Sequence, residues 1–105
     1  MRTMIKFKIP VDSGNDVIRT GKINSVFEQL LPELKPEAVY LYPDVEDGQR
    51  SGLMVFDMQD PSEIAGVVER FAFGLHATVQ LTPVMVPDDL RKALANVPRI
   101  VENYG

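Results

Sequence analysis

His76 is the only histidine of the chain and the first side chain to consider for acid–base chemistry. An imidazole titrates near neutral pH, so one that lies beside a carboxylate can accept or donate a proton there. The expected strand order places His76 beside the end of the first strand, near Asp12 and Asp16, and pairing with either would raise its pKa. The alternative is a partly exposed turn residue that hydrogen-bonds to the start of the first helix. His76 and Asp12 are therefore candidate catalytic residues, with a purely structural role as the competing interpretation.

A second group of polar side chains is expected to share one face of the predicted sheet. Its members are Lys6, Lys8, Tyr40, Tyr42 and Gln80, with Thr78 beside them. Apolar walls with a few hydrogen-bond donors are typical of sites for a small acidic or aromatic ligand, and a lysine in a desolvated pocket can act as a base. The alternative is a dimer interface in which the lysines extend to the solvated rim. These residues form the candidate ligand-binding set.

No metal or cofactor is expected. The acidic stretch "DVEDG" (44–48) has the composition of a calcium loop, but Pro43 and Val45 stand where that loop requires oxygen ligands. It is interpreted as the solvated tip of a hairpin. The chain has no cysteine and one histidine, which leaves too few ligands for a conventional zinc or iron site.

Phosphate binding and serine catalysis have little support. The stretch "SGND" (13–16) offers backbone N–H groups at a helix start, but it lacks the glycine spacing of a phosphate-binding loop. No serine lies in the G-x-S-x-G turn that presents a serine nucleophile. Helix capping is therefore the interpretation of "SGND".

The composition indicates one soluble globular domain. The chain has 105 residues, of which 45% are hydrophobic and 25% charged. A net charge of −4 argues against binding to nucleic acid or to an anionic membrane, both of which attract basic surfaces. No apolar run has the length of a membrane span or of a secretory signal. We expect a cytoplasmic protein that starts at Met1 or at Met4.

Four segments alternate apolar and polar residues with the period of a β-strand. They are "MIKFKIPV" (4–11), "EAVYLYP" (37–43), "GLMVFDM" (52–58) and "ATVQLTPV" (77–84). Gly48 lies between the second and third segments and supplies the positive-φ position of a turn. These two segments are therefore predicted to form a hairpin.

Apolar residues with helical spacing follow the first and third of these strands. The first helical region is interrupted near Gly21 and ends near Leu31, and the next helix runs from the N-cap Asp60 to about Gly74. The stretch "PDDLRKALANVP" (87–98) predicts a short C-terminal helix, after which the tail is expected to be flexible. The element order predicts one α+β domain over the whole chain, with a ferredoxin-like antiparallel sheet of order 4-1-3-2.

The sheet face away from the helices is expected to be partly apolar. Met54, Phe56 and Met58 of the third strand are assigned to it, beside Tyr40 and Tyr42. Monomers rarely expose such a patch, so a two-fold homodimer through this face is expected. The alternative is that the C-terminal helix folds back over part of the face.

The phrases "IKFKIPVDSGN", "VFDMQDPSEI" and "LTPVM" give the chain a family resemblance. Together with the element order, they resemble a small uncharacterised bacterial branch of the dimeric α+β barrel group of ferredoxin-like domains. The resemblance covers most of the chain, but its motifs are structural ones. That superfamily includes cofactor-free monooxygenases, lactone isomerases, haem enzymes and members with no known activity. The fold therefore implies no single function, and no family catalytic residue is carried onto this sequence.

Two functional hypotheses follow. The first is a homodimeric small-molecule-binding or accessory module. The alternative is a cofactor-independent enzyme of the isomerase or monooxygenase type, acting on a small organic acid or an aromatic compound.

Overall fold

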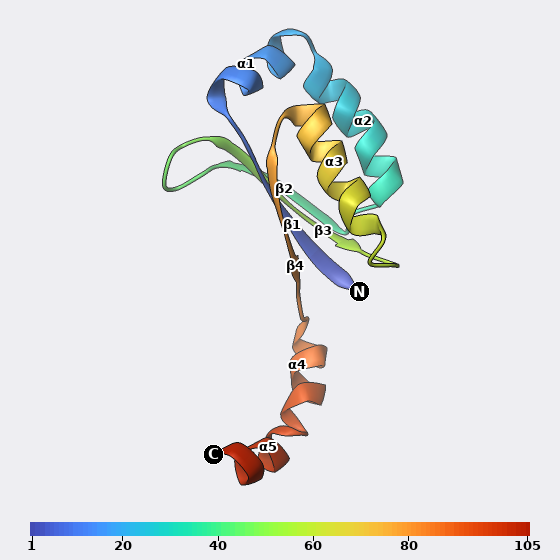
Figure 1. Ribbon diagram of the computed structural model, residues 1–105, viewed down its shortest axis with the longest axis vertical. Helices are drawn as coiled ribbons and strands as arrows, with labels where there is room; N and C mark the ends of the chain where they lie inside the picture. Colours follow the sequence, from blue (N-terminus) through green and yellow to red (C-terminus); the bar gives the residue numbers. More distant parts are fainter.

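The fold combines one antiparallel sheet, a layer of helices on one of its faces and a helical arm that leaves the sheet (Figure 1). The computed structural model describes all 105 residues. The strands are β1 (Arg2–Ile9), β2 (Ala38–Pro43), β3 (Arg50–Asp57) and β4 (Thr78–Pro83). The helices are α1 (Val11–Arg19), α2 (Lys22–Leu34), α3 (Glu63–Leu75), α4 (Pro87–Leu94) and α5 (Val97–Tyr104). The predicted α+β class is confirmed.

Strand β1 lies inside the sheet, between β3 and β4. The strand order is β2-β3-β1-β4, with every neighbouring pair antiparallel, which reads β4-β1-β3-β2 from the other edge. Residues that lie directly opposite each other in such pairs point to the same face. Ile5 of β1 pairs with Met54 and with Leu81, so these three side chains share the face beneath the helices.

The core lies between this face and the helix layer. The ring of Phe7 on β1 lies against Phe71 of α3, with ring centroids 4.8 Å apart, and against Phe27 of α2 at 6.2 Å. Gly52 of β3 lies under the same ring, where an added Cβ would be 2.1 Å from the Phe7 Cζ atom. The close approach of this ring to the backbone therefore requires glycine at position 52.

The predicted faces of β3 were wrong. Met54, Phe56 and Met58 are buried in the core instead of facing away from the helices, and Met54 is 0% exposed. Leu53 and Val55 take the other face. Because both faces of β3 are apolar, the period-two alternation cannot say which face is turned to the helices.

Some helix boundaries also differ from the predicted ones. Helix α1 begins at Val11, directly after β1 and without a side-chain cap, so "SGND" lies inside the helix. Helix α2 continues through Pro32 and ends at Leu34. Because Pro32 lies close to this end, its missing N–H removes a hydrogen bond only from the last turns of the helix. Gly74 lies within α3, which ends at Leu75, and does not follow the helix as predicted. Val26 of α2 packs against it, 3.1 Å from where a Cβ would stand, so the close approach of the two helices favours glycine there.

Residues 84–105 form an arm that stands away from the rest of the molecule (Figure 1). In place of one short helix and a flexible tail it contains two helices, α4 and α5, and neither has a buried residue. The radius of gyration is 17.2 Å, whereas a compact chain of this length has about 13 Å. The C-terminal helix does not fold back over the sheet. Across the molecule, no helix combines the length and the apolar character that crossing a bilayer requires.

Candidate ligand-binding site on the open sheet face

The predicted ligand-binding residues lie on the sheet face opposite α1, α2 and α3, which we call the open face. Its strand register forms rows of side chains across the sheet. One row contains Tyr40, Leu53, Lys6 and Gln80, and the next contains Tyr42, Ser51, Lys8 and Thr78. The sheet thus brings side chains from β1, β2 and β4 together, as the sequence predicted.

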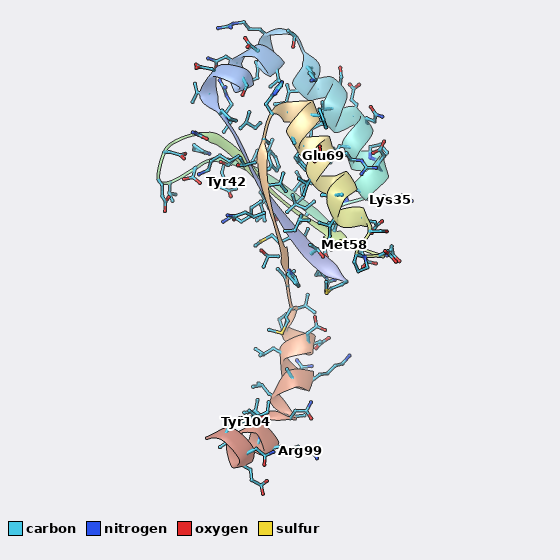
Figure 2. The ribbon with its side chains drawn as sticks, in the orientation of Figure 1. Lys35, Tyr42, Met58, Glu69, Arg99 and Tyr104 are labelled. Atoms are coloured by element: carbon cyan, nitrogen blue, oxygen red, sulfur yellow. The ribbon has the colours of Figure 1, made fainter.

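A cavity of about 330 Å³ opens over these rows. Its polar lining consists of Lys6, Lys8, Tyr42, Asp44, Ser51, Thr78 and Gln80. Tyr40 is the predicted ligand-binding residue that does not line it, and its side chain is 64% exposed on the edge strand β2. Figure 2 shows Tyr42 beside the β2–β3 hairpin, well away from Tyr104 on the arm.

Two carboxylates of the β2–β3 turn hold Lys8. Its Nζ atom lies 3.2 Å from Asp44 and donates a hydrogen bond to Asp47 at 3.0 Å. The hydrogen bonds to Asp47 and Asp44 raise the pKa of Lys8 above its ordinary value of 10.5. Backbone N–H groups of the turn, followed by Lys8 itself, lower the pKa values of Asp44 and Asp47. Lys8 therefore stays protonated at neutral pH and is unsuited to act as a base there.

Asp44 is a lining residue that sequence reasoning missed, because the turn was interpreted as a solvated tip. The Asp44 N–H donates to the Gln49 carbonyl at 2.9 Å, and Gly48 has a φ of 70°, so residues 44–49 form a closed turn. This turn is longer than a two-residue hairpin and can bend its carboxylates toward the sheet. The signals in the sequence that could have revealed this contact were the length of the turn, its acidic residues and the lysines of the first strand.

Lys6 is the cavity's unpaired cation. It is exposed, it makes no hydrogen bond or ion pair, and its cross-strand neighbours are Leu53 and Gln80. An ammonium group without a protein counter-ion can bind the carboxylate of a ligand through charge-assisted hydrogen bonds. The Gln80 amide and the Thr78 hydroxyl offer further donors, and the ring of Tyr42 offers an apolar wall. The arrangement suits a small anion with an apolar part.

His76 and Asp12 lie outside this cavity lining. His76 is exposed and ends α3 in the left-handed conformation, with φ 54° and ψ 32°. No hydrogen bond or ion pair joins it to Asp12 or to Asp16, and the Asp16 carboxylate pairs instead with Arg19 at 3.3 Å. The expected pairing is therefore not formed, while a catalytic role for His76 or Asp12 stays a prediction.

A second, more apolar cavity of about 380 Å³ lies between α2 and the edge strand β2. Its apolar lining consists of Phe7, Ile9, Ile23, Phe27, Leu41 and Pro43. At its rim, Arg50 donates a hydrogen bond to the Asn15 side chain at 3.0 Å and has no carboxylate partner. Sequence reasoning missed this cavity because it depends on how a helix packs against the edge of the sheet. Acidic and histidine side chains nowhere gather into a group that could hold a metal ion.

The four-stranded antiparallel sheet with helices on one face is compatible with a ferredoxin-like domain. Function has to be inferred from the geometry of the sites, because comparison with known proteins supplies no relative. No family model matches the chain, and no curated protein or solved structure is significantly similar to it.

Proposed function

We propose that this chain is a small-molecule-binding module of the ferredoxin-like, dimeric α+β barrel type, and that its open face binds a small organic anion. The observation that carries the proposal is the cavity in which Lys6 has no counter-ion while Lys8 has two. Lys6 is thus the lining cation that remains free for a ligand carboxylate. The size of the cavity, about 330 Å³, lies at the lower end of the range for small-molecule sites.

The ligand is oriented by the order of side chains across the open face. Its carboxylate meets Lys6 and the Gln80 amide, and its apolar part lies against the ring of Tyr42. Lys8 acts indirectly, because its ion pairs with Asp44 and Asp47 tie the turn to the sheet and shape one wall. Asp44 also places a negative charge at this wall, which favours a monoanion over a dianion.

We further propose that two copies pair through the open face to form a homodimer. The apolar residues that support this dimer are not those that the sequence assigned to the open face, because Met54, Phe56 and Met58 lie in the core. Leu53 and Val55 replace them on the open face and are only partly covered within one chain. Apolar residues near the middle of an uncovered sheet face are typical of a surface that a partner buries.

Lys6→Ala tests the ligand site. We expect the amide signals of β1 and β4 to shift when benzoate or acetate is titrated into the ¹⁵N-labelled protein, with benzoate binding more tightly because of Tyr42. Loss of one charge-assisted hydrogen bond in Lys6→Ala should weaken binding about tenfold. Lys92→Ala is the matched control, because it removes the same charge from an exposed position on α4. Equal affinity of the two variants, or no shifts with either anion, would refute the site.

The alternative function is a cofactor-independent enzyme acting on a small organic acid or an aromatic compound. It requires a base, and the cavity offers little support for one, because Lys8 is held protonated and His76 lies outside the lining. Turnover that is lost in His76→Ala, with the fold and benzoate binding unchanged, would favour this alternative over a binding module.

A further inference from the structure

The arm formed by residues 84–105 exposes a set of large apolar side chains. Its members, between 36% and 87% exposed, are Met85, Leu90, Leu94, Val97, Ile100, Val101 and Tyr104. Along α5 they recur at positions i, i+3, i+4 and i+7, while Arg99, Glu102 and Asn103 occupy the remaining surface. This spacing is that of an amphipathic helix whose apolar stripe is turned toward a packing partner.

The two arm helices cannot owe their stability to their own length. Each has eight residues, which is shorter than an isolated helix needs in water. Neither helix buries a residue against the sheet or against α1–α3. An apolar partner surface outside this chain is therefore the expected source of their stability.

The connection to β4 directs the arm away from its own open face. The Val84 N–H donates to the Arg2 carbonyl at 3.1 Å, so the pairing with β1 continues past the end of β4. Val86 is extended, with φ −93° and ψ 166°, and α4 starts immediately after it at Pro87. The arm thus runs on beyond the end of β4 (Figure 1). A reverse turn would be needed for it to cover its own sheet, and this connection contains none.

Near the edge from which the arm leaves, and directly inside a terminal row in which Arg2 lies opposite Asp57, the open face is apolar. One row of the register there contains Ala38, Val55, Met4 and Thr82, and the next row adds Tyr40 and Leu53. The ligand cavity, with Lys8 and Tyr42, lies toward the other end of the same face. One chain therefore presents two unpartnered apolar surfaces, the arm and this part of the open face.

We infer that the two surfaces cover each other between copies: the arm of each chain packs on the apolar part of the partner's open face. A two-fold axis makes this arrangement self-consistent, because each copy supplies one arm and one receiving face. The arm carries three acidic residues (Asp88, Asp89 and Glu102) and three basic residues (Arg91, Lys92 and Arg99). Nucleic acid and anionic lipid both require a basic polar face, so a protein surface is the better fit.

This inference rests on the proposed pairing of two copies and adds that the arms hold the pair together. Light scattering coupled to size-exclusion chromatography tests it. We expect the wild type to have twice the chain mass of 11.7 kDa and Leu94→Asp/Val101→Asp to have the chain mass itself. Asn96→Asp/Asn103→Asp is the matched control, since it adds the same charges to the arm outside the apolar stripe and should remain dimeric. A dimeric Leu94→Asp/Val101→Asp variant would overturn arm exchange, and a monomeric wild type would overturn the pairing as well.

Cross-linking then decides where the arm lies, because the chain has no native cysteine. Val101→Cys and Val55→Cys proteins, mixed and treated with a short bis-maleimide, should give a cross-linked pair of chains. Ser25→Cys on the helix layer, mixed with Val101→Cys, should not. A link formed within one chain of the Val55→Cys/Val101→Cys variant would show the arm folded onto its own sheet, and a dimer without the mixed link would show pairing without exchange. Both results contradict the inference, and neither bears on benzoate binding at Lys6.

Discussion

Met54 and Leu53 are adjacent on β3, yet their side chains lie on opposite faces of the sheet and differ in how far they are buried. Met54 is 0% exposed beneath the helix layer, whereas Leu53 lies on the open face and is only partly covered. Both side chains are apolar and similar in size. The difference shows that what packs against a face, and not the composition of the strand, decides whether its residues stabilise the single chain.

The largest difference in stability between the two faces should appear when Met54 and Leu53 are truncated one at a time. Met54→Ala leaves a cavity in a fully packed core and should lower the free energy of unfolding by about 2–5 kcal/mol. Leu53→Ala removes a half-covered side chain and should cost less than about 1 kcal/mol in the dilute monomer. Urea unfolding measured at low protein concentration gives both values. Equal losses would mean that the open face is as well packed as the helix-covered one.

Gly52→Ala should have an intermediate effect on the helix-covered face. The added methyl would stand 2.1 Å from the Phe7 ring, so ring and strand must shift, at a cost of about 1–3 kcal/mol. Gly66→Ala is the control, because the atom nearest to its methyl belongs to the flexible side chain of Arg70. In α3 it should be neutral or stabilising by up to about 1 kcal/mol. If Gly52→Ala were equally harmless in the same urea experiment, the close approach of Phe7 would be incorrect.

The smallest expected effect is a pH dependence of stability that comes from the ion pairs of Lys8 on the open face. The lowered pKa values of Asp44 and Asp47 stabilise the folded turn above the ordinary carboxyl value of 3.8, and this contribution is lost as the pH falls through the lower folded values. The raised pKa of Lys8 acts in the opposite direction, so its contribution is present below 10.5 and is lost at higher pH. The groups are solvated, which keeps the effect small.

Lys8→Met measures this contribution directly. The difference in urea midpoint between Lys8→Met and the wild type should be constant around neutral pH and should shrink in strong acid. Lys92→Met, which removes a charge without an ion-pair partner, should show no such profile. A Lys8→Met difference that persists unchanged after the carboxylates are protonated would indicate a packing effect rather than ion pairs.

Much of the fold was predictable because its signals are local. Lys6 and Lys8 alternate with Ile5 and Phe7, so the two faces of β1 follow directly from the sequence. Helix α3 begins at Glu63, with Ser62 and not the predicted Asp60 as its N-cap, but the predicted contact of Glu63 with the residues before the helix is formed: its carboxylate accepts N–H hydrogen bonds from Gln59 and Asp60. Patterns of this kind depend on neighbours a few residues away.

The candidate site was predictable only in part, because its closing elements come from distant segments. Lys6, Lys8, Tyr42 and Gln80 were grouped correctly once the strands were known. The contribution of Asp44 depends on how the β2–β3 turn bends toward the sheet. The apolar cavity beside α2 depends on the packing of a helix against a strand edge, for which no local pattern exists.

The sequence by itself determined where the four strands and the first four helices form, their order along the chain and which β1 side chains are polar, since alternation, capping and turn residues act over short distances. Only the tertiary structure decided which apolar face of β3 is buried, that His76 ends α3 in the left-handed conformation without pairing with Asp12, and that the last two helices stand apart from the sheet. Each of these outcomes depends on contacts between segments far apart in the chain. In such contacts, competition between alternative partners outweighs the preference of any single residue.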